Sequence, residues 1–309
     1  MATTQPAATR NPSAEDLPAL HFIEASDAVR IAARRFQPAL QPKAALVIAP
    51  AMGVSQGFYA AFARWLTTQG YAAYTFDYRG TGASRPEGSL RGYRANISDW
   101  AQLDCAAVIE HVSAEQPGLP IFWVGHSVGA QILGLIPNHR RLTAMLSVAA
   151  GSGYHRLNAP PLRYYAPVLW HALAPLALRL AGYFPGRRLG LVGDLPYGVM
   201  VQWRKWCLSP AYLGGESPEV RARLAHVKLP ISAWSMRDDE MMTFAGTRAL
   251  FALYTGAPVE LVRMDPAAHG LRSIGHFGFF RAQSRDALWP LVTAWVERHA
   301  QALAAERCA

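Results

Sequence analysis

Cysteine is scarce in this chain, which narrows the possible folds and sites. The 309 residues include three cysteines, Cys105, Cys207 and Cys308, and none of them forms a CxxC pair or a cluster with histidine. Disulfide-linked scaffolds and zinc sites need such spacings. The sequence therefore predicts neither a disulfide framework nor a metal site.

Lysine is almost absent, and so are clusters of charge. The net charge is +9, but most cations are arginines that occur singly or in short pairs, such as Arg34-Arg35 and Arg187-Arg188. Nucleic-acid-binding domains gather their basic residues on one face or along one helix. The glycine-rich motifs of nucleotide-binding loops are missing as well. We expect no nucleic-acid partner and no cofactor.

No segment has the length and polarity of a leader or a membrane span. The start of the chain, MATTQPAATRNPSAEDLPAL, is polar and lacks the apolar stretch of a signal peptide. The most apolar segment, YYAPVLWHALAPLAL at residues 164–178, is too short to cross a bilayer. These features predict a cytoplasmic protein without integral membrane insertion, with a flexible tail over residues 1–18.

What the chain does have is an alternation of two kinds of segment. Continuous apolar runs, such as AALVIAPAM (residues 44–52) and IFWVGHS (residues 121–127), are typical of strands buried on both faces. Segments with helical spacing lie between them, such as GFYAAFARWLTTQG. The alternation predicts an α/β fold with a mostly parallel sheet flanked by helices.

This alternation stops over residues 155–226, where no strand is evident. The segment is rich in Tyr, Trp, Leu and Pro. We interpret it as a helical cap inserted into a core made of residues 19–154 and 227–309. Its composition predicts an apolar roof over one end of the sheet, which suits a hydrophobic small-molecule substrate.

Gly125-His126-Ser127-Val128-Gly129 fits the pattern G-x-S-x-G at the junction of a predicted strand and a predicted helix. A strand that turns at once into a helix strains its corner residue, and small residues two positions away let the backbones pass closely. We predict that Ser127 is a nucleophile. The Val128 N–H, at the helix N-terminus, would then donate to a developing oxyanion.

A nucleophilic serine needs a general base and a group that orients the base. After the predicted strand ISAWSM come Asp238 and Asp239, and after VELVRMDP come His269 and His276, in the chain order that accompanies G-x-S-x-G. The residues alone do not decide which aspartate is the acid or which histidine is the base. Spacing favours His269, whereas the flexible Gly275 and the aromatic residues after the ring favour His276.

The segments APAMGV, DYRGTGAS, GHSVG and DDE…GHFGFF resemble landmarks of the α/β-hydrolase superfamily. The likeness runs from Leu20 to the C-terminus, without much of the predicted cap. It is nearest to bacterial hydrolases related to the serine aminopeptidase and monoglyceride lipase group. The resemblance implies an α/β-hydrolase fold. It also implies Asp239 as the acid, with Asp238 as the alternative, and His276 as the base, with His269 as the alternative.

One departure from the family pattern is visible. Where the family usually has His-Gly at the end of the third strand, this chain has Pro50-Ala51. By position, the Met52 N–H would be the second oxyanion donor. A main-chain donor tolerates the change, because any non-proline residue supplies an N–H.

Together these residues predict a serine hydrolase that cleaves a carboxylic ester or related acyl substrate through an acyl-enzyme on Ser127. An acyltransferase, a peptidase or amidase, and a non-catalytic binding protein on the same scaffold are the alternatives, which a shared fold separates poorly. His126 is expected to pack behind the nucleophile, and Asp77, Arg79 and Ser84 to hold the turn after the fourth strand. The sequence carries no prediction of the oligomeric state.

Overall fold

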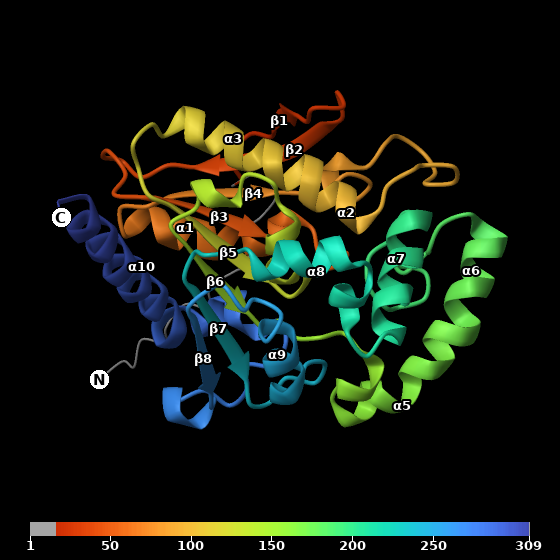
Figure 1. Ribbon diagram of the computed structural model, residues 1–309. Coiled ribbons are helices and arrows are strands. Elements are labelled where there is room, and N and C mark those ends of the chain that lie inside the picture. The colour runs from red at the N-terminus through yellow and green to blue at the C-terminus, as the bar shows by residue number, and fades with distance from the viewer. Residues whose placement is uncertain (1–16, 309) are drawn as a thin grey trace, which may run out of the picture.

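An eight-stranded sheet with helices on both sides organises residues 17–308, which the computed structural model describes (Figure 1). The strands are β1 His21–Glu24, β2 Arg30–Phe36, β3 Ala45–Ala49, β4 Ala72–Phe76, β5 Ile121–His126, β6 Ala144–Val148, β7 Ile231–Met236 and β8 Val259–Met264. Their order is β1-β2-β4-β3-β5-β6-β7-β8. β2 is antiparallel to β1 and β4, and the other neighbours are parallel. The predicted α/β architecture is confirmed; residues 1–16 of the predicted tail lie outside the described residues.

The central strands separate two hydrophobic cores. All residues of β3 to β7 are buried, which explains their continuous apolar sequences. In β5, Trp123 belongs to one core, whereas Phe122 and Val124 belong to the other. A shift of one residue in register would exchange the two sets, so burial on both faces fixes the pairing of the strands.

Helices cover both faces of this sheet. They are α1 Ala60–Thr68, α2 Ile97–Asp99, α3 Ala106–Glu115, α4 Val128–Gln131, α5 Pro160–Val168, α6 Ala174–Ala181, α7 Tyr197–Leu208, α8 Pro218–Ala225, α9 Phe244–Phe251 and α10 Arg285–Cys308. α1 and α10 contribute to the core on one face, and α3 and α9 to the core on the other. Among the described residues, no helix is both long and apolar enough to cross a membrane.

Helices α5 to α8 lie between β6 and β7 in the chain, and Figure 1 shows α5, α6 and α7 grouped on one side of the sheet. We call residues 155–226 the inserted segment; its interpretation as a separate cap stays a prediction. The segment touches the loop after β3, because a Cβ on Gly53 would lie 2.6 Å from the Gly193 N. An ion pair between Arg85 and Asp194, at 2.8 Å, adds a second attachment to the core.

The helix expected after Ser127 is shorter than its sequence suggests. α4 covers only Val128–Gln131, and a 3₁₀ turn, Leu133–Leu135, follows it. The Tyr254 hydroxyl explains the break, because it donates to the Gln131 carbonyl (2.9 Å) and accepts from the Gly134 N–H (3.3 Å). Since these two main-chain groups bond to a side chain, the regular helical ladder cannot continue through them.

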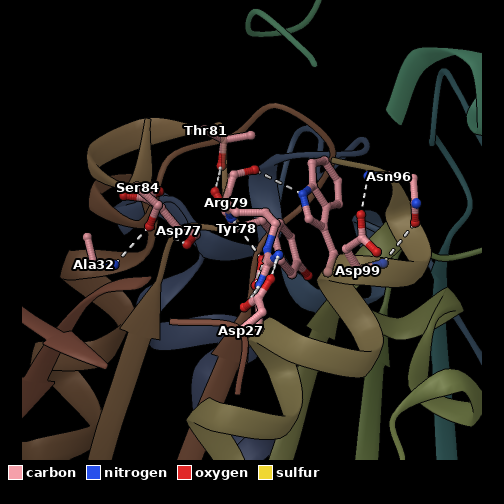
Figure 2. A network of polar contacts seen from close by, with 11 residues as sticks. Asp27, Ala32, Asp77, Tyr78, Arg79, Thr81, Ser84, Asn96 and Asp99 are labelled. Carbon is pink, nitrogen blue, oxygen red and sulfur yellow. Dashed lines mark hydrogen bonds and ion pairs between the residues drawn. The ribbon is translucent and has the colours of Figure 1, made fainter. Parts of the chain in front are cut away.

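A buried polar network holds the turn after β4, as Figure 2 shows. Arg79 is 4% exposed, and its Nε donates to Asp104, a wholly buried residue, at 2.6 Å. Its two terminal nitrogens donate to Asp27 at 2.6 and 2.9 Å. The Ser84 hydroxyl donates to the Asp77 carbonyl at 2.6 Å. Burial raises the pKa of the Asp104 carboxyl, and the Arg79 guanidinium opposes that rise.

Arg79→Met is expected to lower the free energy of unfolding by about 3 kcal/mol, because it leaves the Asp104 carboxyl buried without a cation. The deficit should be larger at about pH 8 than at about pH 5, as urea denaturation would measure. In the native protein Arg79 lowers the Asp104 pKa that burial raises, so the pKa of the unpaired carboxyl should be higher still. Below that pKa the unpaired Asp104 is neutral and tolerates burial, and this tolerance is lost as the pH rises through it.

Arg79→Met combined with Asp104→Leu is the control for the Arg79 prediction. The double variant should recover most of the lost stability and should lose the added pH dependence, because no charge remains buried. A double variant that is no more stable than Arg79→Met would contradict the buried-charge explanation.

Candidate active site

Ser127 stands at a strained corner between β5 and α4. β5 ends at His126 and α4 begins at Val128, so a single residue makes the turn. Its φ of 52° and ψ of −116° are rare for a residue other than glycine. Such conformations persist only where the surroundings enforce them, and they cluster at functional sites.

Gly125 and Gly129 are required by close approaches of the backbone. A Cβ on Gly125 would lie 2.5 Å from the Ala130 N, and a Cβ on Gly129 would lie 2.4 Å from the Ala49 O. Main-chain atoms cannot move aside as the end of a flexible side chain can. The two glycines therefore let α4 pack directly on the ends of β5 and β3, which accounts for their spacing around the serine.

His276 and Asp239 form a buried pair. The His276 Nδ1 lies 2.9 Å from the Asp239 Oδ2, and both side chains are almost completely buried. The other carboxylate oxygen accepts from the N–H groups of Met241 (2.7 Å) and Met242 (2.8 Å). A carboxylate at Nδ1 fixes the imidazole tautomer that leaves a lone pair on Nε2, as a general base requires.

The two carboxylates beside Asp239 bind the main chain of the His276 loop. The Asp238 Oδ2 accepts from the Ile274 N–H at 2.8 Å, and the Glu240 Oε2 accepts from the His276 N–H at 3.0 Å. Between these two amides lies a glycine with φ 62°. Three successive carboxylates thus hold one short loop, two by its backbone and one by its ring.

The alternative residues occupy other positions. Asp238 bonds to a main-chain amide, whereas Asp239 meets an imidazole. His269 ends a 3₁₀ turn, Ala267–His269, while His276 is the ring paired with Asp239. The geometry therefore brings together Asp239 and His276, and their catalytic roles stay predictions.

Both ring nitrogens of His126 form hydrogen bonds, which packing alone does not require. Its Nδ1 accepts from the Tyr59 hydroxyl (2.8 Å), which in turn accepts from the Ala51 N–H (2.9 Å). Its Nε2 donates to the His276 carbonyl at 2.9 Å. Burial and the nearby His276 ring lower the pKa of His126 well below its usual value, so the ring is neutral. The sequence did not predict the Tyr59–His126 hydrogen bond, because Tyr59 lies in a segment whose only evident pattern is that of an apolar helix.

Ser127 is linked to His276 through the preceding residue, His126, and not by a direct hydrogen bond. In the part of the chain that the structure describes, no hydrogen bond joins the Ser127 Oγ to His276. The rings of His126 and His276 nevertheless lie 5.2 Å apart between centroids, and His126 precedes the serine directly. Catalytic hydrogen bonds are often long in the absence of substrate and tighten in the complex.

The two predicted oxyanion donors lie on the segments that flank the serine. Val128 is the first residue of α4, and Met52 follows β3; both residues are buried. Neither main-chain N–H donates a hydrogen bond within residues 17–308. The first N–H groups of a helix have no partner inside the helix, so the Val128 N–H is available to an anion.

An apolar cavity of about 260 Å³ lies beside this pair, under the inserted segment. It reaches the site at Phe277, next to His276, and at Met241 and Met242, whose amides bind Asp239. The rest of its lining is Gly153, Asn158, Leu162, Ala166, Leu169, Trp170, Phe184, Leu191, Val192, Met200, Trp203 and Cys207. Burial raises the pKa of the Cys207 thiol well above its usual range, so this cysteine is a neutral part of the wall.

Metal ligands do not gather anywhere in the described chain. Across residues 17–308, no group of three or more His, Cys, Asp or Glu side chains could hold a metal ion.

Solved structures share this architecture. A soluble variant of monoglyceride lipase from Saccharomyces cerevisiae superposes on 95% of this chain and 98% of its own, with a TM-score of 0.66 and 17% identity. An esterase from Pyrococcus furiosus covers 95% of this chain and 96% of its own, with a TM-score of 0.60 and 15% identity. The chain has the α/β-hydrolase fold. The fold that the resemblance in the sequence implied is confirmed.

Part of this chain also resembles a narrower group. Residues 40–184 match the family model described as serine aminopeptidase, S33; this range includes Ser127 but neither Asp239 nor His276. Human monoglyceride lipase is 32% identical over 121 residues, which are 38% of this chain and 37% of that protein. A monoglyceride lipase homolog of monkeypox virus is 30% identical over 116 residues, 36% of this chain and 40% of that protein. The chain thus matches less than half the length of either relative.

Glu240→Ala should free the loop of His276 in this protein. The His276 N–H loses its acceptor, a bond worth about 1 kcal/mol, so its hydrogen exchange is expected to accelerate about fivefold. Amide exchange followed by NMR measures the rate. Glu240→Gln keeps an acceptor oxygen and should exchange at nearly the wild-type rate. Equal acceleration in both variants would mean that the charge, not the bond, holds the loop.

Proposed function

We propose that the protein is a serine hydrolase that cleaves carboxylic esters through an acyl-enzyme on Ser127. The observation that carries the proposal is the buried Asp239–His276 pair, at 2.9 Å, whose histidine contacts His126, the residue before a serine at a strained corner. A nucleophile, a base and a carboxylate that orients the base are the parts this chemistry needs.

In the proposed reaction, the Ser127 Oγ attacks the carbonyl carbon of the ester while the His276 Nε2 takes its proton. Asp239 stabilises the imidazolium that forms. The carbonyl oxygen becomes an anion, which accepts hydrogen bonds from the Met52 and Val128 N–H groups. Collapse of the tetrahedral intermediate breaks the bond to the alcohol, and His276 returns the proton to the departing oxygen.

Water completes the proposed cycle. His276 takes a proton from a water molecule that attacks the acyl-enzyme, and the resulting intermediate releases the carboxylic acid and restores the Ser127 hydroxyl. The Ser127 Oγ and His276 must come within hydrogen-bond reach for either half to proceed. We infer that the bound substrate completes this contact.

The cavity suggests a hydrophobic acyl group as substrate. Its lining is almost entirely apolar and aromatic, as acyl-chain pockets are. The likeness to proteins named monoglyceride lipase agrees with an ester of a fatty acid and a small alcohol. An aminopeptidase, by contrast, needs an acidic group for the cationic end of its substrate, and the described residues that line the cavity include no Asp or Glu.

Labelling with a fluorophosphonate probe tests the nucleophile and the base. Ser127→Ala should abolish labelling, because the bond forms at Oγ, and His276→Ala should slow it at least 100-fold. Gel fluorescence against time measures the rate. His269→Ala is the matched control and should label at the wild-type rate. Persistent labelling of Ser127→Ala would refute the proposal, and a normal rate in His276→Ala would move the base elsewhere.

Leu162→Trp should change the selectivity for acyl length, because a larger side chain fills part of the cavity. With p-nitrophenyl esters, kcat/KM for the octanoate is expected to fall about tenfold, while the acetate stays unaffected. Leu180→Trp, at an exposed position, is the matched control. Equal losses for both esters would show that the cavity does not bind the acyl chain.

Hydrolysis of these esters without an added acceptor alcohol would also count against an acyltransferase.

A further inference from the structure

The helical run from α5 to α6 carries apolar side chains on its outer side. Residues 160–181 are helical throughout, since a π-helical turn, Leu169–Leu173, joins α5 to α6. Along this run, the residues at positions 164, 168, 172, 176 and 180 are exposed and apolar, and the exposed Tyr165 follows the first of them. We call this set the outer face: Tyr164, Tyr165, Val168, Ala172, Leu176 and Leu180. Figure 1 shows α6 at the margin of the molecule.

The opposite side of the same run is apolar as well. Ala166, Trp170, Ala174 and Leu178, again at every fourth position, are buried in the hydrophobic core. A helix with apolar side chains on two opposite sides normally has both of those sides covered. Here only the inner side is covered. Exposed apolar residues are also concentrated in this part of the chain, since most large hydrophobic residues exposed in residues 17–308 lie between Tyr164 and Val201.

The charge around the outer face has one sign. Arg163, Arg179, Arg187 and Arg188 are all exposed. Within residues 155–205 the sequence has a single acid, Asp194. That acid is already paired with Arg85 at 2.8 Å, so it offers no counter-charge to the outer arginines.

We propose that the outer face docks on the surface of an anionic lipid bilayer. Exposed aromatic and aliphatic side chains enter the boundary between headgroups and acyl chains, and arginines beside them bind anionic headgroups. Contact with a second copy of the chain fits less well, because a symmetric dimer through this face would bring the same arginines together. The helices lie on the surface rather than cross it, since no described helix is suited to spanning.

Docking in this way would bring the cavity to the membrane. Leu162, Ala166 and Leu169 line the cavity from the same helical run that carries the outer face. One thin layer of helix would then separate the lipid from the proposed substrate pocket. The docking proposal does not depend on the hydrolase activity, because it concerns binding alone.

Vesicle flotation with the full chain tests the docking proposal. Wild-type protein should float with vesicles of phosphatidylcholine and phosphatidylglycerol, and its affinity for pure phosphatidylcholine should be at least about tenfold lower. Raising the salt concentration should release it. Val168→Ser/Leu176→Ser/Leu180→Ser and Arg179→Gln/Arg187→Gln/Arg188→Gln should each weaken binding at least about tenfold.

Two matched variants change the same residue types elsewhere. Leu20→Ser/Leu40→Ser/Leu261→Ser removes exposed apolar side chains outside the outer face, and Arg140→Gln/Arg285→Gln/Arg298→Gln removes the same charge. Both should bind as the wild type does. Three results would overturn the proposal: no wild-type flotation, equal losses in the matched variants, or a dimer in sedimentation velocity that the outer-face serines convert to a monomer.

Discussion

The turn from β5 to α4 is the constraint on which the site depends. Only Ser127 separates the strand from the helix, and its positive φ is maintained because α4 lies directly on the end of β3. That contact needs Gly129, since any side chain there would meet the Ala49 carbonyl. The same turn makes Val128 the first residue of α4, directly after the serine, with its N–H unpaired within residues 17–308. The proposed nucleophile and its proposed oxyanion donor are therefore products of one tight turn.

His126 connects this turn to the two other parts of the site. Through Tyr59 it reaches the loop after β3, which carries Met52, and through its Nε2 it holds the carbonyl of His276. Because the ring is buried and neutral, both contacts have a fixed direction of donation. The carboxylates at Asp238 and Glu240 hold the same histidine loop from its other side. The proposed base is thus positioned mainly through its backbone.

The inserted segment has two apolar surfaces with different consequences. Its inner side, with Trp170 and Ala166, closes the cavity beside the proposed catalytic pair. Its outer side exposes Tyr164, Val168 and Leu176 among arginines. The apolar side chains on the outer side remain in contact with water. Covering them with a binding partner would therefore be favourable.

The sequence by itself determined the parts of this protein that depend on neighbouring residues. Apolar runs and helical spacing predict the alternating strands and helices, and the glycines around Ser127 predict a turn that needs close backbone approach. Tertiary structure decided the rest. The fold pairs Asp239 with His276, as the family resemblance implied and the spacing alone did not. It also ends α4 early at the Tyr254 hydroxyl and joins Tyr59 to His126. The physical reason is that these contacts join residues far apart in the chain, and their distances are set by how the elements pack, which no local pattern records.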